Sequence, residues 1–249
     1  MDTVSAGPEV EVRTARGAML YDASCIDQPG DSLFERAYWR SRGALEEVAG
    51  GRGTVAFIRD GARRWVLRHF RRGGFLARFV DDTYLWAGAD GTRSFTEWRL
   101  LRRLREWGLP VPRPIAARYT RSGLAYRADL ITEELPSRLT LAQALAAQPL
   151  DPAGWRAVGQ CVGTLPSHGV RHADLNANNL LLGAQGAVYV LDFDRGGIEP
   201  RGDWEQRVIE RLHRSLEKVS RDLPAGRFDA AQWDEFLQGV AACAPSTSC

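Results

Sequence analysis

The period of the hydrophobic residues changes along the chain. In the first half, short β-prone runs predict strands at 18–21, 54–58, 65–70, 116–120 and 125–132. Asp60-Gly61 lies between two of these runs, which is typical of a β-hairpin. Spacing of three to four residues predicts only two helices in this half, at 31–48 and 93–107.

The second half of the chain has mainly helical spacing. Helices are predicted at 139–147, 155–168, 203–219 and 231–242, with one short apolar strand at 188–193. Strands followed by helices indicate an α+β fold in two lobes, with a hinge near 133–136. We therefore expect an N-terminal arm and a small β-rich N-lobe over residues 1–135, and a mostly helical C-lobe over 136–249.

Composition and charge limit the classes of function. The chain has 249 residues, of which 44% are hydrophobic and 26% are charged, so it has enough apolar material for a sizeable core. A net charge of only +2 argues against a protein that coats nucleic acid, and no nucleic-acid partner is expected. Residues 1–130 carry +6 and residues 131–249 carry −4, so the basic half could face an anionic partner.

Cysteines and apolar runs point to the cytosol. The four cysteines form no C-x-x-C pair and fit no zinc framework. The N-terminal residues lack the basic and apolar regions of a signal peptide, and no apolar run approaches the roughly 18–20 residues that span a bilayer. We expect a cytosolic protein with reduced thiols, for which peripheral membrane contact remains open.

The candidate chemistry lies between residues 172 and 197. Asp174 and Asn179 are five residues apart in a polar stretch, and Asp192 follows a short apolar run. Phosphoryl transfer needs a carboxylate that orients the acceptor hydroxyl, together with a few oxygen ligands for Mg²⁺. Asp174 suits the first task, and Asn179 and Asp192 suit the second. The alternative is that the three residues only cap turns or lie in a loop.

This stretch resembles the catalytic loop and metal-binding turn of protein kinases, H-R-D-L-x-x-x-N followed by D-F-G. Residues 172–179 read H-A-D-L-N-A-N-N, and residues 192–194 read D-F-D. Ala173 therefore replaces the arginine of the loop, and Asp194 replaces the glycine of the turn. Two matching segments in the right order are far more specific than a single glycine motif.

Upstream residues fit the same pattern with two departures. Gly51 and Gly53 lie between two predicted strands, where a glycine-rich loop would cover the nucleotide phosphates, but Ala56 replaces the third glycine. Arg68 takes the place of the usual phosphate-binding lysine, and Glu97 on the following helix is its natural ion-pair partner. The alternatives are a plain hairpin turn for the glycines and solvated charges for the other two residues.

Several segments make the resemblance narrower. They are similar to the 3-deoxy-D-manno-octulosonic acid (Kdo) kinase family, relatives of the lipopolysaccharide heptose kinases, over roughly residues 45–220. The matching segments are 67–74, 108–112, 172–176 and 192–196, together with Thr92, Arg93 and Glu97. In that family, alanine after the loop histidine and D-F-D in the turn are usual. Ala173 and Asp194, which depart from the protein-kinase pattern, therefore agree with the pattern of this family.

The resemblance implies a bilobal protein-kinase-like fold, with ATP and Mg²⁺ as cofactors. It implies transfer of the ATP γ-phosphate to the 4-hydroxyl of Kdo in a Kdo–lipid IVA acceptor during lipopolysaccharide inner-core synthesis. Asp174 would be the catalytic residue, Asn179 and Asp192 the metal ligands, and the protein would lie peripherally on the cytoplasmic face of the inner membrane.

The features of the acceptor side are less specific. Only 57 residues follow Asp192, and they contain no A-P-E anchor, which favours a small or glycolipid acceptor over a peptide. Two basic stretches, 71–86 and 207–221, are candidates for contact with an anionic membrane surface. Their alternatives are packing in the lobe core for the aromatic residues and a solvated helix face for the charges.

Two other classes of function also fit the sequence. A heptose kinase, or a small-molecule kinase of the aminoglycoside or choline type, would share the same loop and turn. A nucleotide-binding pseudokinase scaffold would explain the missing lysine and the missing third glycine. The presence of Asp174, Asn179 and Asp192 argues against the scaffold.

Overall fold

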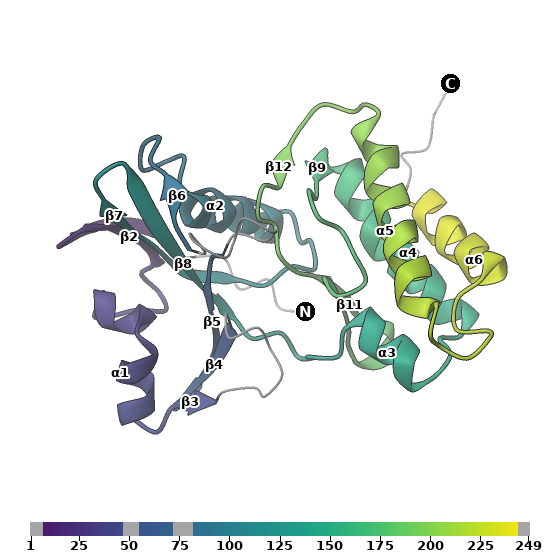
Figure 1. The fold of residues 1–249 in the computed structure, drawn as a ribbon, viewed down its shortest axis with the longest axis horizontal. Coiled ribbons are helices and arrows are strands. Elements are labelled where there is room, and N and C mark those ends of the chain that lie inside the picture. Colours follow the sequence, from purple (N-terminus) through teal and green to yellow (C-terminus); the bar gives the residue numbers. More distant parts are fainter. Residues whose placement is uncertain (1–6, 47–54, 72–81, 244–249) are drawn as a thin grey trace. The chain divides into compact units, whose positions relative to one another are not determined.

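The computed structural model describes residues 7–46, 55–71 and 82–243 (Figure 1). The chain forms two compact units, Met1–Trp107 with Pro112–Glu134 and Gly108–Val111 with Leu135–Cys249. A largely antiparallel sheet comes first and most of the helices follow, so the predicted α+β class is confirmed. Gly51 and Gly53 lie outside the described residues, as does most of the basic stretch that begins at Arg71.

The first unit is built on an antiparallel sheet with strand order β1-β2-β7-β8-β5-β4-β3, and β6 pairs with β8. Its strands are β1 (Glu9–Thr14), β2 (Gly17–Asp22), β3 (Leu45–Glu46), β4 (Val55–Asp60), β5 (Arg63–His69), β6 (Tyr84–Leu85), β7 (Pro114–Ser122) and β8 (Ala125–Glu133). Its helical elements are η1 (Asp31–Phe34), α1 (Arg36–Ser41) and α2 (Arg93–Glu106).

The predicted hairpin is confirmed by the pairing of β4 with β5, in which Val55 lies opposite Arg68 and Asp60 opposite Arg63. Gly61 has φ +59° in the turn, a left-handed conformation that glycine adopts without strain. The register places Arg68 near the end of the hairpin away from this turn.

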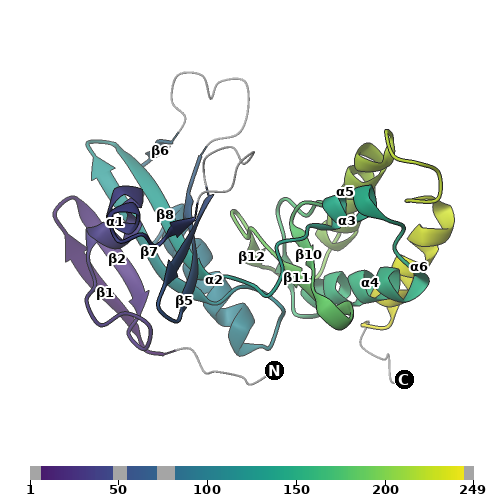
Figure 2. The same cartoon turned by 90° about the horizontal axis from the view of Figure 1, so that it is seen from below.

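Opposite faces of this sheet pack against different helices (Figure 2). Leu67 of β5 belongs to an apolar cluster that includes Phe34 of η1 and Trp39 of α1. The neighbouring Arg68 instead forms an ion pair with Glu97 of α2. Because successive strand residues point to opposite faces, α1 covers one face of the sheet and α2 the other.

The predicted helix over 31–48 is wrong in its extent. The segment forms η1 and the short α1, and then turns into β3. Glu35 between the two helical pieces is extended, with φ −100° and ψ 115°, so the helical hydrogen bonds cannot continue through it. Gly43, at φ +64°, reverses the chain after α1 and directs it into the sheet.

The second unit is mainly helical. Its helices are α3 (Leu141–Ala147), α4 (Pro152–Ser167), α5 (Trp204–Ser220) and α6 (Ala230–Ala241), with a short η3 turn (Ala184–Gly186). Two short hairpins complete it, formed by β10 (Leu180–Leu182) with β11 (Val188–Val190) and by β9 (Val170–Arg171) with β12 (Gly197–Ile198).

Helices α4 and α6 pack against each other with their backbones in close approach. A Cβ on Gly159 of α4 would lie 2.0 Å from the carbonyl oxygen of Phe236, so only glycine allows this approach. Phe236 and Trp155 are fully buried beside this contact. Within the described residues, no helix is long and apolar enough to cross a bilayer.

Candidate active site

The polar loop between β9 and β10 is organised around a buried histidine. His172 is fully buried, and its Nδ1 accepts a hydrogen bond from the backbone N–H of Asp174 at 3.2 Å. Its Nε2 lies 2.8 Å from the carbonyl oxygen of Leu191. Because Nδ1 accepts, the proton lies on Nε2, which donates to Leu191. The imidazole thus joins the start of the loop to the residue before Asp192.

Burial also fixes the charge of this histidine. Loss of solvation lowers the pKa of His172 below its usual value, and the bond to Leu191 opposes this only in part. The imidazole is therefore neutral near neutral pH. With both ring nitrogens engaged by the backbone, His172 braces the loop.

Asn179 closes the same loop from its far end. Its Nδ2 donates to the carbonyl oxygen of Asp174 at 3.0 Å, and Asn176 Nδ2 donates to the same oxygen at 2.8 Å. The carbonyl of Asn179 accepts from the backbone N–H of Leu191 at 2.8 Å. Since Nδ2 is turned toward the loop, Oδ1 is the side-chain atom of Asn179 available to a cation.

Asp192 follows β11, which is shorter than the predicted strand because the chain turns here. Its φ is +63°, a left-handed conformation that costs about 1–3 kcal/mol in a residue other than glycine. Leu191 is tied to the loop on one side, and on the other Phe193 is buried with its ring 4.8 Å from that of His172. Backbone strain held in place by its surroundings is a feature of functional sites.

The ligand chemistry of these residues fits Mg²⁺. Asn179 and Asp192 offer an amide and a carboxylate oxygen, the hard donors that this ion prefers. Magnesium commonly takes one or two protein ligands and completes its octahedron with water and phosphate oxygens. The two residues are held together because Asn179 and Leu191 share a backbone hydrogen bond.

The carboxylate of Asp174 faces a cation that the sequence pattern did not identify as part of the site. Arg211 of α5 donates from Nε to Asp174 Oδ1 at 2.9 Å, and its Nη2 contacts the same oxygen. Both side chains are about half exposed, at 49% for Arg211 and 53% for Asp174. From the sequence, Arg211 belonged to a basic stretch that either contacts an anionic surface or forms a solvated helix face. Helical spacing alone does not reveal a contact between residues 37 positions apart.

The structure brings Arg68 and Glu97 together within the first unit. Arg68 Nη2 donates to Glu97 Oε2, linking β5 to α2. The Glu97 side chain is only 3% exposed and that of Arg68 22%, so the pair is shielded from water. The guanidinium of Arg68 also lies 4.6 Å from the ring centre of Phe70, a cation–π contact that helps to fix its direction.

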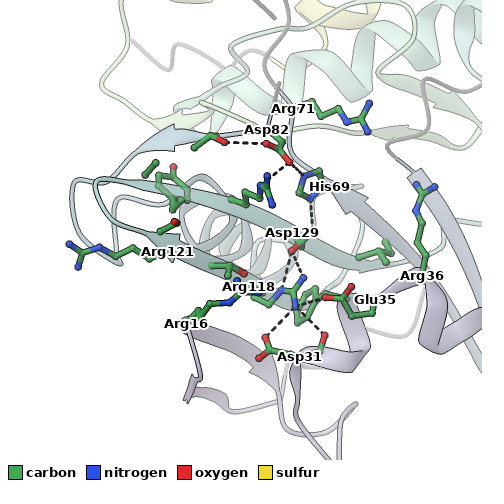
Figure 3. A pocket seen from close by; sticks show the side chains of 18 of the residues that line it. Arg16, Asp31, Glu35, Arg36, His69, Arg71, Asp82, Arg118, Arg121 and Asp129 are labelled. Carbon is green, nitrogen blue, oxygen red and sulfur yellow. Dashed lines mark hydrogen bonds and ion pairs between the residues drawn. The ribbon is translucent and has the colours of Figure 1, made fainter. Parts of the chain in front are cut away.

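The first unit contains a second charged region, a pocket of about 880 Å³ (Figure 3). At its centre Arg118 donates to Asp129 at 2.8 Å, to Glu35 at 3.0 Å and to Asp31 at 3.2 Å. His69 Nδ1 lies 2.6 Å from Asp129 on the same network. Leu67 and His69 alternate with Arg68 along β5, so this pocket lies on the face of the sheet opposite Arg68.

The network also sets the charge of His69. The hydrogen bond to Asp129 raises the pKa of His69, and a second contact, from Nε2 to Asp82 at 3.4 Å, acts in the same direction. A protonated imidazole can donate to both carboxylates at once. Asp129 is therefore bound by Arg118 and, when the imidazole is protonated, by a second cation, His69.

Comparison with known proteins agrees with these local features. A sequence profile of the lipopolysaccharide kinase (Kdo/WaaP) family matches residues 36–239. The chain is 37% identical over 208 residues to a 3-deoxy-D-manno-octulosonic acid kinase of Vibrio parahaemolyticus, covering 84% of this chain and 87% of that protein.

Two further relatives carry the same name. The protein from Stenotrophomonas maltophilia strain R551-3 is 44% identical over 205 residues, covering 82% of this chain and 81% of its own. That from Xanthomonas axonopodis pv. citri is 45% identical over 204 residues with the same two coverages. The resemblance inferred from the sequence is confirmed, and the chain belongs to the lipopolysaccharide kinase (Kdo/WaaP) family.

Proposed function

We propose that this protein transfers the γ-phosphate of ATP to the 4-hydroxyl of Kdo in a Kdo–lipid IVA acceptor. Its curated relatives are named as kinases of this sugar acid, and the chain matches them over more than four fifths of its length. The fold would be bilobal and protein-kinase-like, with residues 1–135 as arm and N-lobe and 136–249 as C-lobe. The division of the chain between Glu134 and Leu135 supports this assignment.

The main observation in support of this function is the hydrogen-bonded frame around His172. It ties Asp174, Asn179 and the residue before Asp192 into one piece of backbone within the second unit. Phosphoryl transfer depends mainly on positioning and on electrostatic stabilisation, so a rigid frame under these side chains suits that reaction. A loop of turn-capping residues would not need a fully buried histidine or a strained aspartate.

Each residue of the frame has a separate task in the proposed reaction. Asp174 would accept the hydrogen of the acceptor hydroxyl and hold its oxygen toward the phosphorus atom. Asn179 and Asp192 would hold Mg²⁺, which when bound neutralises charge on the phosphate oxygens. Both ring nitrogens of His172 are occupied, so it would keep Asp174 in place and carry no proton.

The nucleotide contacts of the first unit are proposed by the same reasoning. Arg68, oriented by Glu97, would contact phosphate oxygens in place of the usual lysine. Gly51 and Gly53 would lie over the phosphates, as glycine-rich loops do in kinases. Because arginine presents a fixed fork of donors, its direction matters more than that of a lysine, and the buried Glu97 supplies it.

We also propose peripheral binding to the cytoplasmic face of the inner membrane. The proposed acceptor is an anionic lipid, and residues 1–130 carry a net charge of +6. The membrane partner would then be attracted by charge, with arginine forks meeting phosphate and carboxylate groups.

The direct test is incubation of the purified protein with ATP, Mg²⁺ and Kdo–lipid IVA, followed by mass spectrometry of the lipid. The expected product gains one phosphate, located on the 4-hydroxyl by fragmentation. Asp174→Asn should reduce the rate by about 10²–10⁴-fold while ATP binding is retained. Asp222→Asn, an exposed aspartate beyond α5, is the matched control and should leave the rate unchanged.

The same assay separates the other functions. A heptose kinase would phosphorylate heptose-bearing acceptors and leave Kdo–lipid IVA unmodified. A pseudokinase scaffold would bind nucleotide without metal-dependent turnover on any acceptor. Either result would contradict the proposal.

A further inference from the structure

Arg211 is positioned by the packing of α5. The helix presents Leu212 and Leu216 to the core, and both side chains are fully buried. One turn beyond Arg211, the hydroxyl of Ser215 accepts a hydrogen bond from the backbone N–H of Ala177 at 3.1 Å. Residues four apart lie on the same side of a helix, so α5 holds the loop at two points, at Asp174 and at Ala177.

The ion pair with Asp174 engages only part of the hydrogen-bonding capacity of Arg211. Nε and Nη2 both donate to one oxygen, Oδ1 of Asp174. A guanidinium has five N–H groups, and Arg211 has no other partner in the part of the chain that the structure describes. With 49% of its side chain exposed, the remaining donors are open to solvent beside the carboxylate.

Only one of the two carboxylate oxygens of Asp174 takes part in the ion pair. Oδ1 accepts both bonds from Arg211, and Oδ2 has no side-chain partner among the described residues. Oδ2 is therefore available for the acceptor hydroxyl. The site thus offers an acceptor oxygen and cationic donors side by side, on the two members of one ion pair.

The proposed acceptor carries two groups that match this arrangement. A 3-deoxy-2-ulosonic acid bears its carboxylate on carbon 2, and its first ring hydroxyl is on carbon 4. A single methylene separates these two carbons, so both groups can meet neighbouring side chains at once. Arginine is suited to a carboxylate because its fork can donate two parallel hydrogen bonds.

We propose that Arg211 recognises the acceptor, binding the carboxylate of the sugar acid while it holds Asp174 against the hydroxyl to be phosphorylated. This inference rests on the proposed function and adds the means by which a sugar acid is distinguished from a neutral sugar. A neutral sugar would leave the free donors of Arg211 without a partner, and such an omission weakens binding.

The test compares two acceptors, Kdo–lipid IVA and its carboxyl methyl ester, with wild-type protein, Arg211→Gln and Arg211→Lys. For the wild type, esterification should raise the acceptor KM by about 10–100-fold, the loss of a charge-assisted hydrogen bond. Arg211→Gln should raise the KM for the free acid by a similar factor and leave that for the ester within about 3-fold. Arg211→Lys should recover part of the affinity for the acid, because it keeps the charge but loses the fork.

The controls separate recognition from loss of structure and from nucleotide binding. Arg201→Gln removes an exposed charge just before the same helix, outside the two basic stretches, and should change neither KM. The KM for ATP should stay unchanged in Arg211→Gln, and so should its melting temperature. Where turnover is too low to measure, binding of the two lipids without ATP gives the same comparison.

Two results would overturn the inference. Equal losses on acid and ester would mean that Arg211 acts only by positioning Asp174. A higher KM for ATP with an unchanged KM for the acceptor would assign Arg211 to the nucleotide phosphates. Both results are distinct from failure of the proposed function, in which the wild-type protein would not phosphorylate Kdo–lipid IVA at all.

Discussion

Two arginines of this protein pair with aspartates in opposite ways. The side chain of Arg118 in the first unit is 10% exposed and binds three carboxylates, those of Asp129, Glu35 and Asp31. The side chain of Arg211 in the second unit is 49% exposed and binds only Asp174 among the described residues. Both form charge-assisted hydrogen bonds, but only Arg118 is enclosed by its partners.

The difference separates charges that are enclosed within the fold from charges that are exposed to solvent. Arg118 joins β7 and β8 to the η1 segment, and its acidic partners neutralise it from several sides (Figure 3). Breaking such a buried pair is costly because the remaining charge stays buried. The exposed pair uses only Oδ1 of Asp174 and two nitrogens of Arg211, so under our proposal both side chains take a further partner from the acceptor while their ion pair is kept. A large charged pocket is thus a weaker indication of a reaction site than an exposed ion pair with hydrogen-bonding groups left over.

The largest effect on stability is expected for Arg118→Met. The change keeps an unbranched apolar stem but leaves Asp129, which is 4% exposed, without its main partner. The free energy of unfolding of the first unit should fall by about 3–5 kcal/mol. Thermal unfolding followed by tryptophan fluorescence measures the loss, and Arg121→Met on the pocket rim is the control. Equal stability of the two variants would contradict the structural role.

The next largest effect is expected on the KM for ATP, in variants of the Arg68–Glu97 pair. This pair is shielded from water like Arg118, but it is proposed to contact phosphate. Glu97→Gln keeps the shape and removes the charge that orients Arg68, so the KM for ATP should rise about 10-fold with a smaller change in kcat. Arg68→Ala should raise it further. Steady-state kinetics at saturating acceptor measures both variants. Unchanged kinetics in Arg68→Ala would remove Arg68 from the site.

The loop of the second unit should be sensitive to acid. Burial lowers the pKa of His172, so the folded protein binds fewer protons there than the unfolded chain does. The contribution of His172 to the free energy of unfolding is therefore full above about pH 6.5, the pKa of a histidine in the unfolded chain. It decreases as the pH falls below that value, by at most about 1.4 kcal/mol per pH unit. Melting temperatures between pH 8 and pH 5 measure this slope. His172→Gln cannot take up a proton, so it should flatten the slope, and an unchanged slope would show that other groups cause it.

His69 in the first unit should make stability depend on pH in the opposite sense, and more weakly. Its hydrogen bond to Asp129 raises its pKa, so its contribution is full below the unfolded value near 6.5 and disappears as the pH rises through the folded value. With 29% of its side chain exposed, solvent screens part of the effect, and about 1 kcal/mol is expected at pH 6. The melting difference between wild type and His69→Gln should shrink from pH 6 to pH 9. A difference that grows with pH would contradict this assignment.

Local patterns predicted much of this fold and some of the site. The β4–β5 hairpin and α2 follow from residue spacing, because each is decided by neighbours in the sequence. The loop from His172 to Asn179 could be recognised for the same reason. The break at Glu35 could not, since the hydrophobic period continues across it while the backbone becomes extended.

Contacts between distant residues could not be predicted from spacing. The partner of Asp174 lies 37 positions away on α5, and nothing in the periodicity of that helix distinguishes Arg211 from the other basic residues. The Arg118 network likewise joins three separate elements through side chains that are ordinary surface types in sequence. The left-handed Asp192 ended the predicted strand early, because an apolar run does not encode a single strained φ angle.

The contrast between the two regions can be measured with one pair of isosteric substitutions. Asp174→Asn and Asp129→Asn each remove one charge from an aspartate that is bound to an arginine. The turnover number for Kdo–lipid IVA and the melting temperature should be determined for both. We expect Asp174→Asn to lose turnover and keep its melting temperature, and Asp129→Asn to lose melting temperature and keep its turnover while folded. Retained turnover in Asp174→Asn, together with lost turnover in a fully folded Asp129→Asn, would contradict the account.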